Sequence, residues 1–105
     1  MDSDRFNEIV DDQLLHIKKV LASKGDEYAR GDRLSNFKRA ATRMGCAPEK
    51  ALMFFREKHE CSILDIIDDL ERGCYPSKEL IDEKVGDSIN YLILLKALMY
   101  ERIER

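Results

Sequence analysis

The stretch of residues 89–100 constrains the fold more strongly than any other, because it is apolar nearly all round a helix. Only Asn90 and Lys96 interrupt it. A helix that is apolar on every side has to be buried on every side, and three other helices of a 105-residue chain cannot easily enclose a fourth. We therefore expect this helix at the centre of the fold, or completed by a second subunit in a homo-oligomer.

Apolar residues recur at intervals of three and four along most of the chain, which indicates helices. Helices are predicted over residues 4–23, 35–44 and 48–72, and from residue 78 almost to the C-terminus. Five Gly and two Pro leave few of the turn residues that an all-β fold needs. The sequence thus predicts one all-α domain over residues 1–105, resembling a four-helix bundle.

Charge and composition argue against several classes of protein. With 18 Lys and Arg against 21 Asp and Glu, the formal net charge is −3, which disfavours nonspecific binding to nucleic acid. No apolar run reaches the roughly 18 residues of a membrane span, and the acidic N-terminus lacks the apolar region of a signal peptide. We expect a cytoplasmic protein in which Cys46, Cys61 and Cys74 are free thiols, because they lack metal-binding spacing.

Glu83 and Asp87 are the first candidates for a chemical role. They lie four residues apart on one face of the last predicted helix, with Asn90 one turn further along. At this spacing two carboxylates are about 6 Å apart and can share Mg²⁺ with water and substrate phosphates. The alternative is a solvated acidic turn near a helix N-terminus, which the helix dipole favours. Because the acidic row continues into an apolar stretch, both interpretations stay open.

His59 is the second candidate, since it falls within the apolar stripe of the third predicted helix. Lys58 and Asp65 belong to a polar ridge beside that stripe. The short connection after residue 72 suggests that the third and fourth helices pack antiparallel, so these groups could face the acidic pair. Asp65 would then be a third metal ligand or a general base, and His59 would donate to a phosphate or a carboxylate. The alternative is a hydrogen-bonded core histidine and a surface aspartate.

Glu57 and Glu60 form an acidic pair three residues apart on the same predicted helix. At 100° per residue their side chains are expected to point away from the stripe that holds His59. We interpret both as surface charge.

The polar stretch over residues 24–37 is the third candidate. It places Asp26, Tyr28 and Asn36 close together, and ordering such a segment costs conformational entropy unless something holds it. These residues could contact the base or sugar of a nucleotide, and Arg39 could meet its phosphates. The alternative is a plain connection followed by a helix with a basic outer face.

Three stretches together resemble a known group of proteins: KGDEYARGDRLSNF at 24–37, ALMFFREKHECSILD at 51–65 and IDEKVGDSINYLILLKAL at 81–98. They resemble small phage and prophage proteins of the nucleotide-modification-associated type, which are similar to the MazG-type all-α NTP pyrophosphatases. The resemblance implies a MazG-like helical scaffold, Mg²⁺ as cofactor, hydrolysis of nucleoside triphosphates to monophosphate and pyrophosphate, and assembly into dimers or tetramers. In the family's second acidic motif, EE-x-x-D, this sequence has Lys84 in place of one glutamate.

Two functions follow as hypotheses. One is a Mg²⁺-dependent nucleoside triphosphate pyrophosphohydrolase-like protein, and the other is a non-catalytic phage module that binds a nucleotide or a protein partner, which Lys84 favours. In the first, the metal ligands are Glu83, Asp87 and Asp65, and the catalytic candidates are Asp65 and His59. The candidates for substrate binding are Lys58, Asn90, Asp26, Tyr28, Asn36 and Arg39.

Overall fold

Four α-helices make up the described part of the computed structural model, which covers residues 1–27, 32 and 34–105, without the side chains of residues 24–27. The helices are α1 (Ser3–Glu27), α2 (Ser35–Met44), α3 (Pro48–Glu71) and α4 (Lys78–Ile103). No strand occurs in these ranges, so the all-α prediction is confirmed. The predicted bounds agree closely for three helices, whereas α1 continues past residue 23 to Glu27.

Local sequence signals explain where the helices begin and end. Pro48 occupies the first turn of α3, where its missing N–H costs nothing. The Ser77 Oγ accepts a hydrogen bond of 3.1 Å from the backbone N–H of Leu80 and caps the start of α4. Gly45 ends α2 in the left-handed conformation, with φ of 70°, that glycine adopts without strain.

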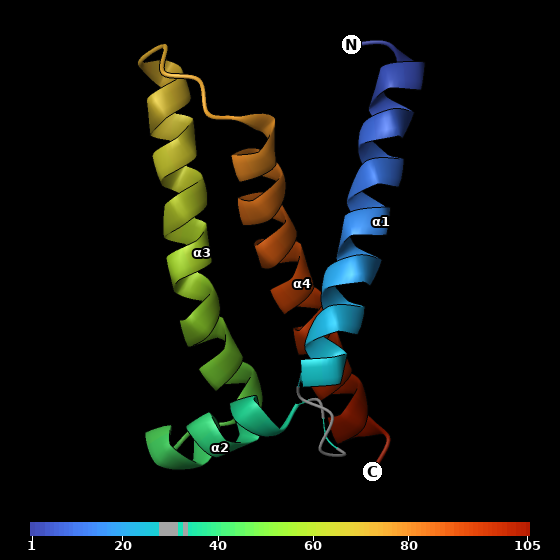
Figure 1. Cartoon of the computed structure of the whole chain (residues 1–105). Helices are drawn as coiled ribbons and strands as arrows, with labels where there is room; N and C mark the ends of the chain where they lie inside the picture. The colour runs from blue at the N-terminus through green and yellow to red at the C-terminus, as the bar shows by residue number, and fades with distance from the viewer. Residues whose placement is uncertain (28–31, 33) are drawn as a thin grey trace.

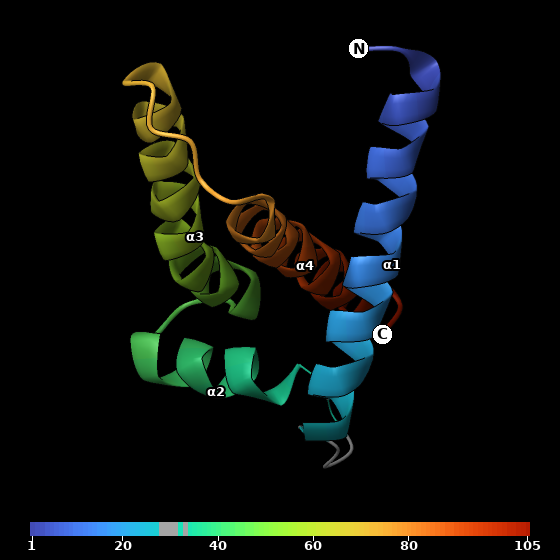
Figure 2. The ribbon, with the colours of Figure 1, turned by 45° about the horizontal axis from the view of Figure 1, so that its top comes forward.

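The helix α4 lies in the middle of the arrangement, between α1 and α3 (Figure 1). The helices α3 and α4 run antiparallel, whereas α1 runs in the same direction as α4 and diverges from it towards its N-terminus (Figures 1 and 2). In the described part of the chain the backbone of α1 lies close to α4 alone and the backbone of α2 to α3 alone. Side chains of α2 also reach α4, as in the ion pair of 2.6 Å between Lys38 and Glu101. The central position expected for the last helix is therefore observed.

Gly86 is the point of close approach between α1 and α4. A methyl group built at its Cα would lie 3.0 Å from His16 Cδ2 and 3.2 Å from Gln13 Nε2, both on α1. These distances are shorter than ordinary van der Waals contact between a carbon and its neighbours. The absence of a side chain at Gly86 thus allows α1 to approach the backbone of α4.

The core is small and lies where α2, α3 and α4 meet. Leu52 is fully buried at its centre, together with Leu34 and Leu98. The stretch 89–100 is only half covered within one chain, because Leu92 and Met99 leave 44% and 48% of their surface exposed. None of the described helices has the combination of length and apolar character that crossing a bilayer requires.

Candidate functional site

His59 of α3 and Asp87 of α4 face each other across the α3–α4 interface. The Nδ1 atom of His59 lies 3.8 Å from Oδ2 of Asp87, and the two side chains are 14% and 25% exposed. This separation is too long for a hydrogen bond but close enough for strong attraction when the imidazole is protonated. The antiparallel packing of the two helices therefore brings together two residues that the sequence singled out.

A row of aromatic rings adjoins this pair. The ring of Tyr91 on α4 lies 4.8 Å from that of His59, and Phe37 on α2 lies 6.2 Å from Tyr91 and 6.3 Å from Phe55. These centroid distances are typical of favourable ring contacts. We call this group, together with Asn90, which precedes Tyr91 in α4, the aromatic site: Phe37, Phe55, His59, Asp87, Asn90 and Tyr91.

Asn90 is the least satisfied polar side chain of the aromatic site. It is 4% exposed, and neither its Oδ1 nor its Nδ2 has a hydrogen-bond partner among the described residues. It follows Asp87 by three residues, so the two side chains lie on the same side of α4. A buried amide without partners costs about 1–3 kcal/mol for each group, and a polar ligand or an ordered water removes that cost. Asn90 is therefore a candidate to bind a polar group.

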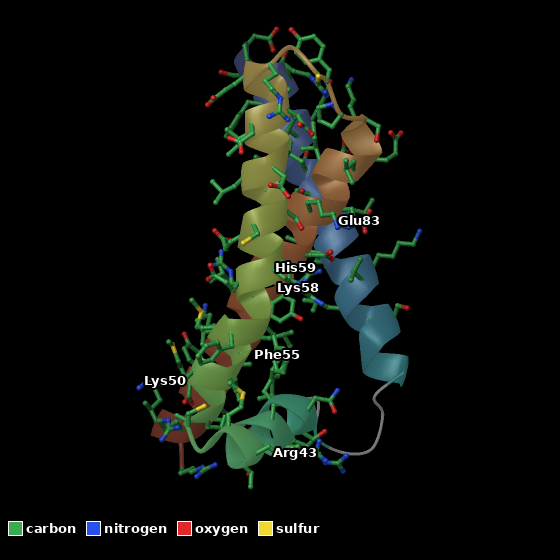
Figure 3. The ribbon with its side chains drawn as sticks, turned by 90° about the vertical axis from the view of Figure 1, so that its left-hand side faces the viewer. Arg43, Lys50, Phe55, Lys58, His59 and Glu83 are labelled. Carbon is green, nitrogen blue, oxygen red and sulfur yellow. The ribbon has the colours of Figure 1, made fainter. Side chains whose placement is uncertain are left out.

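The carboxylates predicted to hold a metal are more spread out than a closed metal site requires. Glu83 lies on α4 towards its start, beyond His59 (Figure 3), and both Glu83 and Asp65 are exposed. No group of three or more His, Cys, Asp or Glu side chains in the described ranges could hold a metal ion. A cation bound by Glu83 and Asp87 would need its other ligands from water and a substrate.

The remaining predicted residues are exposed or lie outside the described residues. Lys58 is exposed on α3 next to His59 (Figure 3), and Asn36 and Arg39 are exposed on α2. Tyr28 and the side chain of Asp26 lie outside the described residues.

The interpretation of Glu57 and Glu60 as surface charge is wrong for Glu60. Its Oε1 lies 2.8 Å from Nη2 of Arg56 and accepts a hydrogen bond of 2.9 Å from Oγ of Ser88, which is buried in α4. Only Glu57 is plain surface charge. The reason is that the α4-facing side of α3 is broad enough to include both His59 and Glu60, which lie 100° apart. The i,i+4 pairing of Arg56 with Glu60 was the signal available in the sequence.

Tyr91 and Phe37 were also missed as site residues. Tyr91 follows Asp87 by four residues, and this spacing, which places both on one face of the helix, was the signal available in the sequence. Phe37 could not be placed, because the sequence does not state which helix α2 packs against.

Comparisons with family models, curated proteins and solved structures find no match to this chain.

Proposed function

We propose that this chain binds a nucleotide at the aromatic site and is a MazG-like, Mg²⁺-dependent nucleoside triphosphate pyrophosphohydrolase or a close relative. The observation that supports this most directly is the buried Asn90 amide, which lacks partners in the described structure and directly precedes Tyr91, a member of the row of aromatic rings, in the sequence of α4. The amide oxygen of asparagine accepts hydrogen bonds and its nitrogen donates two, so this side chain can bond the edge of a nucleobase. Aromatic faces stack on any base.

The charged residues around the aromatic site suit the phosphates of such a ligand. Lys58 directly precedes His59 on α3 and is exposed, and Arg39 is exposed on α2, which carries Phe37. His59 is a third donor through its ring N–H, and its Nδ1 atom lies 3.8 Å from Oδ2 of Asp87. Basic groups placed on two helices can hold a chain of phosphates that extends out from the base.

Glu83 and Asp87 fit Mg²⁺ as an ion delivered with the nucleotide. Mg²⁺ is usually bound by one or two carboxylates, with waters and substrate phosphates completing six ligands. The two side chains are one turn apart on α4, and no third carboxylate is required in this arrangement. When bound, the ion would stabilise the charge that develops on the leaving pyrophosphate. Asp65 is the candidate to accept a proton from the attacking water, and His59 is the candidate to donate to a phosphate.

A non-catalytic binding module is the second candidate function. Lys84 takes the place of an acidic ligand of the family that the sequence resembles, and the described residues contain no ready-made cluster of three metal-ligating side chains. In this alternative the same site binds a nucleotide and does not turn it over.

The decisive experiment measures binding and turnover separately. Isothermal titration with a panel of nucleoside mono- and triphosphates, with and without Mg²⁺, tests binding, and release of pyrophosphate tests hydrolysis. Binding with turnover supports the enzyme, and binding without turnover supports the module. Absence of binding for every nucleotide overturns both.

A further inference from the structure

A single copy of this chain leaves too much surface uncovered for its size. Its radius of gyration is 16.1 Å, whereas a compact domain of this length has about 13 Å. Its accessible surface is 7968 Å², whereas a monomer of 12.2 kDa exposes about 6,100 Å². The excess of about 1,900 Å² exceeds the roughly 800 Å² that each partner buries in a stable interface. The exposed surface is therefore large enough for another chain to bind.

One part of this surface forms an apolar groove on the side of α3 and α4 that faces away from the aromatic site. Met53 and Phe54 are 43% and 67% exposed, and Met99 of α4 is 48% exposed. The groove has a volume of about 640 Å³. We call it the Phe54 face, after the residues that line it: Glu49, Lys50, Met53, Phe54, Glu57, Leu95 and Met99.

We propose that the Phe54 face is the surface on which two copies of this chain associate, with their α3 helices antiparallel about a two-fold axis between Met53 and Phe54. Lys50 and Glu57 lie seven residues apart, so they share one side of α3. The midpoint between them falls between Met53 and Phe54. A two-fold axis at that point places Lys50 of each copy opposite Glu57 of the other. The charges on the Phe54 face of one copy are thus complementary to those on the same face of the other copy.

The shape of the α3–α4 pair also supports a second copy of this chain as the partner. Two antiparallel helices with an exposed apolar side form half of a four-helix bundle, and an identical pair completes it. The association also covers Met99, which belongs to the stretch of α4 that a single chain leaves half exposed. An interface of this kind gains its affinity from the apolar centre and its register from the charges at the edge.

This inference specifies the homo-oligomer but does not depend on nucleotide binding. The aromatic site and the Phe54 face lie on opposite sides of the α3–α4 pair. In Figure 3, Lys50 lies at the other edge of α3 from Phe55. Dimerisation is measured without nucleotide, and nucleotide binding is measured with variants on α4, so either proposal can fail while the other holds.

Reversing the charge of Lys50 or Glu57 tests both the Phe54 face and the proposed register of the two α3 helices. We expect the wild-type chain to be a dimer by sedimentation equilibrium at micromolar concentration. Lys50→Glu and Glu57→Lys each bring like charges together at two symmetric positions and should weaken the dimer at least about tenfold. An equimolar mixture of the two variants, and the double variant, should recover it. Native mass spectrometry identifies the expected heterodimer in the mixture.

Matched controls exclude effects of net charge and of folding. Lys19→Glu on α1 and Glu71→Lys at the end of α3 make the same charge changes at exposed positions outside the Phe54 face and should leave the dimer unchanged. Phe54→Asp should yield a monomer with an unaltered helical circular dichroism spectrum, because this side chain is largely exposed.

Three results would overturn the proposal. One is a wild-type monomer at tens of micromolar. Another is a dimer that Phe54→Asp leaves intact but Leu14→Asp on α1 dissociates, which would place the interface on α1. The third is a pair of weakened single variants whose mixture does not recover, which would reject the two-fold register.

Discussion

Arg56 and Ser88 are joined across the α3–α4 interface by a hydrogen bond of 2.8 Å from the guanidinium Nη2 to the hydroxyl oxygen. The same hydroxyl donates to Glu60 at 2.9 Å, so that one small buried side chain links a cation and an anion on the neighbouring helix. The network fixes the relative position of α3 and α4, which carry most of the aromatic site.

Ser88→Ala should lower the free energy of unfolding by about 1–2 kcal/mol, because it removes two hydrogen bonds from a buried position. Urea denaturation followed by circular dichroism measures the change. Ser62→Ala is the matched control, since the exchange is the same but Ser62 Oγ donates to the Lys58 carbonyl of its own helix. A control loss as large as that of Ser88→Ala would contradict the role given to the network.

Asn90→Leu should stabilise the ligand-free protein and weaken nucleotide binding. Leucine has nearly the shape of asparagine and removes two buried polar atoms that lack partners among the described residues, so a gain of about 1–2 kcal/mol is expected. Thermal unfolding with and without nucleotide measures both effects. Asn7→Leu, at an exposed position on α1, should change neither. A destabilised Asn90→Leu protein would show that the amide is already satisfied.

Asp87→Asn should abolish Mg²⁺-dependent nucleotide binding or turnover while the helical circular dichroism signal stays intact. The substitution keeps the size of the side chain and removes the charge that would face both Mg²⁺ and His59. Asp68→Asn, at an exposed position on α3, serves as the control. A variant that binds Mg²⁺ and nucleotide like the wild type would reject Asp87 as a ligand and leave the acidic turn as a helix start stabilised by its dipole.

The ion pair between Glu49 and Arg102 should make stability depend on pH in the acid range. Arg102 donates hydrogen bonds of 3.0 and 2.8 Å to the two carboxylate oxygens, which lowers the pKa of Glu49 below its ordinary value of 4.5. The unfolded chain then binds more protons, so this contribution is present above the ordinary pKa and is lost as the pH falls through the lowered one.

Glu49→Gln removes that contribution. The difference in unfolding free energy between the wild type and this variant should be largest above about pH 5 and shrink towards about pH 3. Urea denaturation across this range measures it, with Glu71→Gln at an exposed position as the control. A difference that stays constant with pH would contradict the assigned pKa shift.

The helices could be predicted because their signals are local. The three–four periodicity, Pro48 and Ser77 determined where α3 and α4 begin, and the short connection between them predicted that they run antiparallel. With that orientation the polar groups around His59 could face the acidic pair of α4, and His59 Nδ1 and Asp87 Oδ2 lie 3.8 Å apart.

The contacts between helices could be predicted only in part. Periodicity gives the angle of a residue about its own helix, but not the width of the surface that the neighbouring helix covers. Glu60 was therefore assigned to solvent although it bonds Ser88. The position of Phe37 beside Tyr91 depends on how α2 crosses α3, which no local pattern encodes.

The contact between α1 and α4 at Gly86 has a consequence for the order in which the molecule unfolds. Because α1 contacts no other described helix, it can detach without disturbing the core around Leu52. The chain is then divided into two cooperative units of unequal stability, with the α2–α3–α4 unit opening last. Amide protons along α1 should exchange with solvent well before those in the middle of α3, and Gly86, which has no side chain, would be the boundary between the two units.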